Sequence, residues 1–133
     1  MEAKRSTTVL VVEDDPDIRQ AMADLIRDDG YECLFAGNGL EALETLQRTK
    51  PSLILADLLM PVMDGVELLA RLRRDPEYHS IPVVVMTAAT DRLVGLSLDS
   101  LDVPLLRKPI DAEALTQLLA RQSQIAGADP EPT

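Results

Sequence analysis

The feature that most constrains the fold is a regular alternation of short apolar runs with segments of helical periodicity. Each run is rich in Val, Leu, Ile and Ala, which is typical of strands buried on both faces of a sheet. The expected strands are Val9–Val12, Cys33–Ala36, Leu53–Ala56, Val83–Met86 and Val103–Leu106. Because helical segments separate these strands, the alternation predicts an α/β fold, with a five-stranded parallel sheet covered by helices on both faces.

Residues that favour helix ends frame the segments between the strands. Pro16 suits the first turn of a helix, and the apolar residues after it recur at helical spacing. Asn38 and Asp64 each precede a glutamate by three residues, the spacing of a capping box, so each is expected to begin a helix. A glycine interrupts the expected fourth helix, within residues 91–100, and a fifth follows Asp111. The sequence therefore predicts five helices.

The charge balance limits the partners of the chain. Thirteen Lys and Arg residues against 23 Asp and Glu residues give a formal charge of −10, which repels nucleic acid and anionic lipid. We therefore expect no direct binding to nucleic acid or to a membrane. No apolar run approaches the roughly 18 residues of a membrane span, and no export signal follows Met1. The single cysteine, Cys33, is expected in the core, and the expected location is the cytoplasm.

The length of the chain, 133 residues, fits one domain. We expect an N-terminal tail at residues 1–6 and the folded domain at residues 7–122. Residues 123–133 lack periodicity and contain Gly, Pro and acids, so they are expected to form a flexible tail or the beginning of a linker.

Polar and charged residues stand where the expected strands end. The carboxyl ends of parallel strands meet at one edge of a sheet, and ligands bind there in open α/β sheets. Carboxylates brought together repel one another, and a cation relieves that repulsion. Oxygen ligands that leave positions for water and phosphate oxygens suit Mg²⁺, and a lysine adds positive charge. The residues concerned are Glu13, Asp14 and Asp15 after the first strand, Asp57 after the third, Thr87 after the fourth and Lys108 after the fifth.

Four stretches resemble, in order and spacing, the motifs of response-regulator receiver domains of two-component signalling. They are "VVEDDP", "ADLLMPVMDG", "VVVMTA" and "LLRKPID". The resemblance covers about residues 7 to 122 and implies the flavodoxin-like, doubly wound fold with strand order 2-1-3-4-5. Four motifs in the right order are far more specific than one.

The resemblance also implies a role for each site residue. Asp57 is expected to accept the phosphoryl group, and Thr87 and Lys108 are expected to contact the phosphoryl oxygens. Glu13 is expected to support the site without binding the metal. The implied Mg²⁺ ligands are the carboxylates of Asp14, Asp15 and Asp57 and the backbone carbonyl of Leu59.

The function implied is that of a signalling phospho-acceptor. A histidine kinase or phosphotransfer protein would phosphorylate Asp57, and the domain would then switch a surface that binds a downstream protein or forms a phosphorylation-dependent dimer. Such a domain promotes its own phosphorylation and dephosphorylation but does not turn over a separate substrate. A phosphatase of the haloacid dehalogenase type would need a second aspartate two residues after Asp57, where Leu59 stands.

One departure from the receiver pattern leaves an alternative open. Receivers commonly carry Tyr or Phe three residues before the lysine, and this chain has Leu105 there. The alternative is a pseudo-receiver, an interaction module that keeps the fold and signals without phosphorylation. The complete set of acids, threonine and lysine favours phosphorylation, whereas Leu105 favours the pseudo-receiver.

Overall fold

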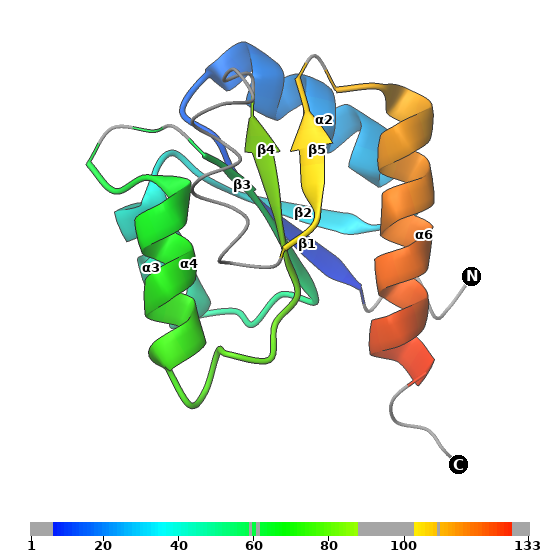
Figure 1. Ribbon diagram of the computed structural model, residues 1–133. Coiled ribbons are helices and arrows are strands. Elements are labelled where there is room, and N and C mark those ends of the chain that lie inside the picture. Colours follow the sequence, from blue (N-terminus) through cyan, green and yellow to red (C-terminus); the bar gives the residue numbers. More distant parts are fainter. Residues whose placement is uncertain (1–6, 59, 61, 88–102, 109, 129–133) are drawn as a thin grey trace.

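The five strands form one parallel sheet in the order β2-β1-β3-β4-β5, as the sequence predicts (Figure 1). The strands are β1 (Thr8–Val12), β2 (Glu32–Ala36), β3 (Leu53–Asp57), β4 (Val83–Thr87) and β5 (Leu105–Arg107). This computed structural model describes residues 7–58, 60, 62–87, 103–108 and 110–128. The doubly wound, flavodoxin-like fold is therefore confirmed.

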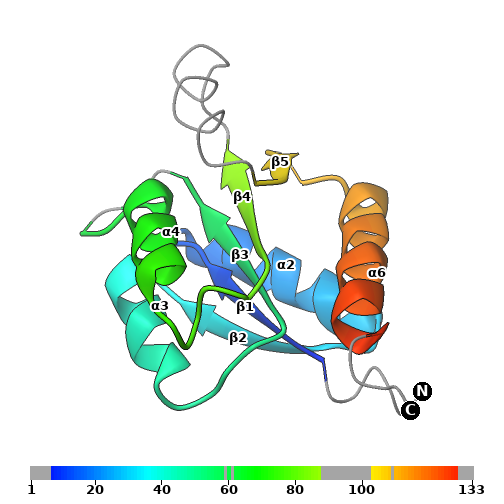
Figure 2. The ribbon, with the colours of Figure 1, turned by 60° about the horizontal axis from the view of Figure 1, so that its bottom comes forward.

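Helices cover both faces of the sheet. Figure 2 shows α2 and α6 on one face and α3 and α4 on the other. The four helices of the described residues are α2 (Pro16–Asp28), α3 (Gly39–Leu46), α4 (Gly65–Arg74) and α6 (Ala112–Ala128). The expected fourth helix, within residues 91–100, lies outside the described residues. Within them, no helix has both the length and the apolar character that crossing a bilayer requires.

Each face of the sheet has its own apolar core. On one face, the cluster combines residues of β1 and β3 with Met22, Ala23 and Ile26 of α2 and Leu115, Leu118 and Leu119 of α6. On the other, it combines residues of the same strands with Ala42 and Leu46 of α3 and Leu68, Leu69 and Leu72 of α4. Both faces of the central strands are buried, which explains their continuous apolar sequences. Cys33 belongs to the first cluster, as expected.

Side-chain caps fix where two of the helices begin. Asn38 Oδ1 accepts a hydrogen bond from the Glu41 amide at 2.9 Å, and Asp64 Oδ1 accepts one from the Glu67 amide at 2.9 Å. The Glu41 carboxylate accepts a further bond from the amide of Gly37, at 2.7 Å. The bonds to Asn38 and Asp64 satisfy amides that a helix leaves without partners in its first turn. The capping residues expected from the sequence therefore act as caps.

Two ends of secondary structure differ from the expectation. The strand expected at Val103–Leu106 begins two residues later, at Leu105, and ends at Arg107. Pro104 lacks an N–H and cannot donate to the ladder, although its carbonyl accepts a bond from the Val85 amide at 3.0 Å. At the other end of the domain, α6 continues past Gln122 to Ala128, through residues expected to belong to a tail.

The connection from β3 to α4 holds a residue in an unfavourable backbone conformation. Val62 has a φ of 70°, in the left-handed region, and its side chain is 74% exposed. A β-branched residue is strained there because its Cβ approaches the backbone carbonyl oxygen. Since so little of the Val62 side chain is buried, packing does not offset this strain. The loop that follows the expected phospho-acceptor is therefore strained.

We expect Val62→Gly to raise the free energy of unfolding by about 1 kcal/mol, because glycine adopts this φ without strain. Urea denaturation of the two proteins measures the difference. Val62→Ala is the matched control: it keeps the Cβ and should recover less of the gain. Equal or lower stability of the glycine variant would contradict a strained loop.

Candidate functional site

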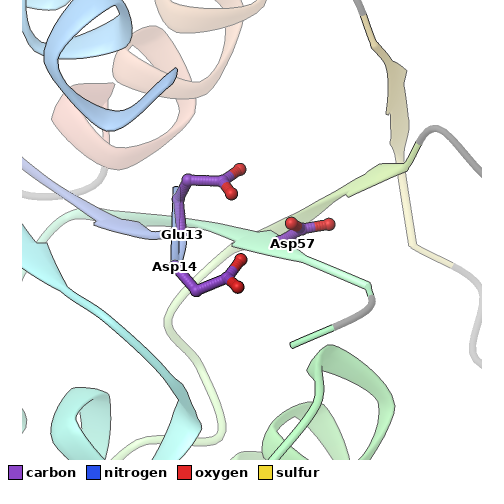
Figure 3. A group of neighbouring side chains, drawn as sticks. All are labelled: Glu13, Asp14 and Asp57. Carbon is purple, nitrogen blue, oxygen red and sulfur yellow. The ribbon is translucent and has the colours of Figure 1, made fainter. Parts of the chain in front are cut away.

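Three carboxylates gather at the carboxyl edge of the sheet. Glu13, Asp14 and Asp57 each offer an oxygen within 4.8 Å of the others. Figure 3 shows Glu13 and Asp14 at the end of β1 and Asp57 at the end of β3, with their carboxylates directed into a common space. Glu13 is 1% exposed and Asp57 is 5% exposed, whereas Asp14 is open to solvent. The site therefore concentrates negative charge in a partly buried space.

Lys108 provides positive charge next to two of these acids. Its Nζ donates a hydrogen bond to Asp57 Oδ2 at 2.8 Å and lies 2.7 Å from Glu13 Oε1. Glu13 Oε1 is buried. Among the described atoms, its contact with Lys108 is an ion pair and does not have the geometry of a hydrogen bond. The one ammonium of Lys108 thus pairs with two buried carboxylates. The three carboxylates of the group carry more negative charge than this ammonium offsets.

Burial and charge together shift the pKa values of this pair. Burial raises the pKa of Glu13, and the charge of Asp57 adds to the rise, against the lowering by Lys108 and by the Asp15 amide. For Lys108, burial lowers the pKa, but the close contacts with Asp57 and Glu13 and their negative charges outweigh it, so the pKa is raised. Lys108 is therefore held in its charged form, while the Glu13 carboxylate lies in a space that disfavours its charge.

The alternation of side chains along strands explains why Glu13 faces Asp57. Val9 and Val11 of β1 pack into the core that contains α2 and α6, and Glu13 continues their alternation. Asp57 continues the alternation of Leu53 and Leu55 in the same way on β3. Val11 pairs with Leu55 in the parallel register, so the next residues on this face of the two strands are the two acids.

Asp15 differs from the expectation for a metal ligand. Its Oδ1 accepts hydrogen bonds from the amides of Asp17 at 2.9 Å and Ile18 at 3.3 Å, so it is the N-cap of α2. Its carboxylate is not part of the group formed by Asp14 and Asp57. The first turn of a helix needs such an acceptor, and Asp15 stands where that turn begins. The acid group of the structure therefore contains Glu13, which was not expected to bind the metal, and does not contain Asp15, which was.

Thr87 and Lys108 lie side by side at the same edge. Thr87 is the last residue of β4 and is 1% exposed, and its carbonyl accepts the Lys108 amide at 2.9 Å. The Leu58 amide donates to the carbonyl of Met86, also on β4, at 2.7 Å. The ends of β3, β4 and β5 are therefore joined here. Leu59, whose carbonyl is the fourth expected metal ligand, lies outside the described residues.

Gly65 allows α4 to pack directly against the strand that carries Asp57. A Cβ at Gly65 would overlap the backbone carbonyl oxygen of Asp57 and lie 3.0 Å from the Cα of Leu58. The Gly65 amide donates to the Leu58 carbonyl at 3.0 Å. The absence of a side chain at Gly65 therefore allows this close contact with Asp57 itself.

We expect Gly65→Ala to lower the free energy of unfolding by about 1 to 3 kcal/mol, because the new methyl group displaces backbone atoms. Chemical denaturation measures the effect. Gly37→Ala is the matched control, since a Cβ there would meet only the side-chain ends of Glu41 and Arg19. A loss for Gly65→Ala no larger than that for Gly37→Ala would contradict the role of this contact.

A separate cavity lies at the other end of β4. It has a volume of about 440 Å³, and its lining includes Arg73 of α4, His79 and Val83. None of the three acids of the site lines it. Val83 begins the strand that Thr87 ends, so this cavity is at the opposite edge of the sheet. The acid site therefore lies at the carboxyl edge, apart from this cavity.

The fold and the site together define a receiver-type signalling domain. The sheet order, the acids after β1 and β3 and the lysine after β5 agree with this class. The family model of the response regulator receiver domain matches residues 9–120. The chain belongs to the response regulator receiver family.

Curated relatives and solved structures agree with this membership. An uncharacterized 14.6 kDa protein in the sodA1 3′ region of Leptolyngbya boryana is 36% identical over 122 residues, which are 90% of this chain and 92% of that protein. Response regulator Rre1 of Synechocystis is 35% identical over 93% of this chain, but the match spans only 56% of Rre1. The chain thus spans about half the length of this second relative.

Among the solved structures, the signal receiver domain of a histidine kinase from Syntrophus aciditrophicus has a TM-score of 0.86 and 28% identity, over 96% of both chains. Chemotaxis protein CheY4 of Vibrio cholerae has a TM-score of 0.79 and 32% identity, over 86% of this chain and 97% of CheY4. Both likenesses cover nearly the whole domain.

Proposed function

We propose that Asp57 accepts a phosphoryl group from a histidine kinase or a phosphotransfer protein, in the presence of Mg²⁺, and that this changes a surface that binds a downstream protein. The observation that carries the proposal is the hydrogen bond from Lys108 to Asp57 Oδ2 inside the acid group. A phospho-acceptor of this kind acts in signalling, and the proposed location is the cytoplasm. A dimer formed on phosphorylation is one form that the response could take.

The acid group fits a divalent cation. It offers three carboxylates within 4.8 Å of one another against the one ammonium of Lys108, so negative charge is in excess. Such oxygens suit Mg²⁺, which keeps several waters and binds through a few carboxylates and phosphate oxygens. We propose Glu13, Asp14 and Asp57 as the residues that hold it, together with the backbone carbonyl of Leu59. When bound, Mg²⁺ would offset the charge of the carboxylates and of the phosphoryl oxygens.

Each side chain then has a defined task in the transfer. A carboxylate oxygen of Asp57 forms the new bond to phosphorus as the bond from phosphorus to the donor histidine nitrogen breaks, and the electron pair of that bond stays on the imidazole. Lys108, held in its charged form beside Asp57, stabilises the negative charge on the phosphoryl oxygens. Thr87, the last residue of β4, would contact these oxygens once the phosphoryl group is attached.

A specific observation keeps the pseudo-receiver as a second candidate. Leu105 on β5 is 39% exposed, an aliphatic side chain at the position where receivers commonly have an aromatic ring. A pseudo-receiver would use this surface of β5 without phosphorylation. The two candidates differ in one outcome, which is whether Asp57 takes up phosphate.

With acetyl phosphate and Mg²⁺, we expect the protein to gain one phosphoryl group, measured by intact mass, because the acceptor and its lysine are both in place. Asp57→Asn should abolish the gain, since the amide is a poor nucleophile. Asp111→Asn is the matched control: Asp111 accepts the Ala114 amide at 2.9 Å outside the site, and asparagine preserves such a cap. Absence of phosphate on the wild type would favour the pseudo-receiver, and uptake by Asp57→Asn would contradict the acceptor.

The metal ligands are tested by the gain in thermal stability on adding Mg²⁺. A ligand that binds only the folded state stabilises it by about 1.4 kcal/mol at ten times its dissociation constant. Asp14→Asn and Glu13→Gln should lose much of this gain. Asp15→Asn should keep it, because asparagine caps a helix as well as aspartate does. If Asp15→Asn lost the gain and Glu13→Gln kept it, the metal ligands after β1 would be Asp14 and Asp15, as the resemblance implies, and not Glu13 and Asp14.

A further inference from the structure

Arg19, outside the acid group, is bonded to the backbone of that group. Its Nη1 donates a hydrogen bond to the carbonyl oxygen of Glu13 at 3.1 Å, across the turn between β1 and α2. Glu13 is 1% exposed, so its carbonyl has little access to water as a substitute partner. The bond therefore satisfies a buried acceptor next to the site.

An aromatic ring on the neighbouring strand holds the guanidinium in place. Arg19 Cζ lies 5.8 Å from the centroid of the Phe35 ring on β2. The ring attracts the cation, and it is partly exposed. The next residue of β2, Ala36, accepts the Glu13 amide through its carbonyl at 3.0 Å. The end of β2 thus contacts Glu13 in two ways. Ala36 accepts the N–H of Glu13, and Phe35 contacts Arg19, which donates to the carbonyl of Glu13.

The carboxylate of Glu13 is held by contacts at both of its oxygens. With the N–H and the carbonyl both fixed, the side chain extends to Lys108 through Oε1 at 2.7 Å, while Oε2 accepts the Asp15 amide at 3.1 Å. Asp14 follows in the same turn, so a rotation about the Cα–C bond of Glu13 would move the Asp14 carboxylate relative to Asp57. It would also move the Asp15 amide that is bonded to Glu13 Oε2. The bond from Arg19 opposes that rotation.

We propose that Arg19 is a positioning residue of the acid site: it holds the Glu13 carbonyl so that the carboxylates of Glu13 and Asp14 face Asp57. The inference rests on the proposed Mg²⁺ site and adds to it a residue that touches neither the metal nor the phosphoryl group. It also links the site to the surface ring of Phe35.

Arg27 offers a matched control for the test. It lies on the same helix, and its Cζ is 5.5 Å from the centroid of the same Phe35 ring. Within the described residues, Arg27 makes no hydrogen bond to the acid site. Arg19→Ala and Arg27→Ala therefore each remove one positive charge and one contact with the ring, and only the first removes the bond to Glu13.

We expect Arg19→Ala to weaken Mg²⁺ binding about tenfold in isothermal titration calorimetry, the usual loss when a residue that supports a metal ligand is removed. Arg27→Ala should change it less than about twofold. Arg19→Lys, which keeps a donor, should recover part of the affinity. If Arg19→Ala and Arg27→Ala bind Mg²⁺ with equal affinity while the wild type binds it normally, Arg19 does not position the site.

A second readout needs no metal. The Asp15 amide is bonded to Glu13 Oε2, so its proton chemical shift reports the direction of the Glu13 carboxylate. Arg19→Ala should move this signal in metal-free protein, and Arg27→Ala should leave it in place. An unmoved signal in folded Arg19→Ala overturns the inference. A wild type that does not bind Mg²⁺ would overturn the proposed metal site, and the amide signal would still decide the role of Arg19.

Discussion

The interaction on which the site depends is the ammonium of Lys108 between two buried carboxylates. It joins Asp57 at the end of β3 to Glu13 at the end of β1, from a residue that follows β5. Buried carboxylates without a partner cost far more than solvent-exposed ones, so the carboxyl edge of the sheet requires this lysine. One ammonium beside three carboxylates leaves an excess of negative charge at this edge, which the proposed Mg²⁺ would offset.

Two contacts from neighbouring helices act on the backbone beside these acids. The Gly65 contact holds the Asp57 strand against α4, and the Arg19 contact holds the turn that carries Glu13. Each acts on the backbone next to an acid and leaves the carboxylate itself free to face the common space. The site is therefore built from backbone contacts made by neighbouring helices, and its charges are placed by the ends of the strands.

Much of this arrangement follows from the sequence, because its periodicities are local. Continuous apolar runs and capping residues such as Asn38 and Asp64 predict the parallel sheet and the helix starts without reference to distant residues. The acidic run after β1 also predicts a charged edge opposite Asp57. What the run does not distinguish is which two acids face Asp57 and which one caps the helix. Counting alternate residues from Val9 and Val11 puts Glu13 on the face that carries Asp57, and Asp15 lies further from the strand, next to the start of α2.

Other features depend on contacts between residues far apart in the chain, which no local pattern reveals. The close approach of Gly65 to the Asp57 carbonyl and the placing of Arg19 over Phe35 arise only when the layers pack. The left-handed conformation of Val62 is contrary to the preference of valine, so no residue preference would predict it. The late start of β5 follows from Pro104, which cannot donate to the ladder. The prediction of a strand from Val103 gave more weight to the apolar residues than to this proline.

In the proposed site, Glu13, Asp14 and Asp57 hold one cation beside Lys108. A crystal structure with Mn²⁺ in place of Mg²⁺ tests it most directly, because Mn²⁺ favours similar oxygen ligands and anomalous scattering locates it. We expect one Mn²⁺ in the space between these three carboxylates, bound to them directly or through its waters, with Asp15 still capping α2. An ion bound by the Asp15 carboxylate, with Glu13 turned away from it, would rule out this site.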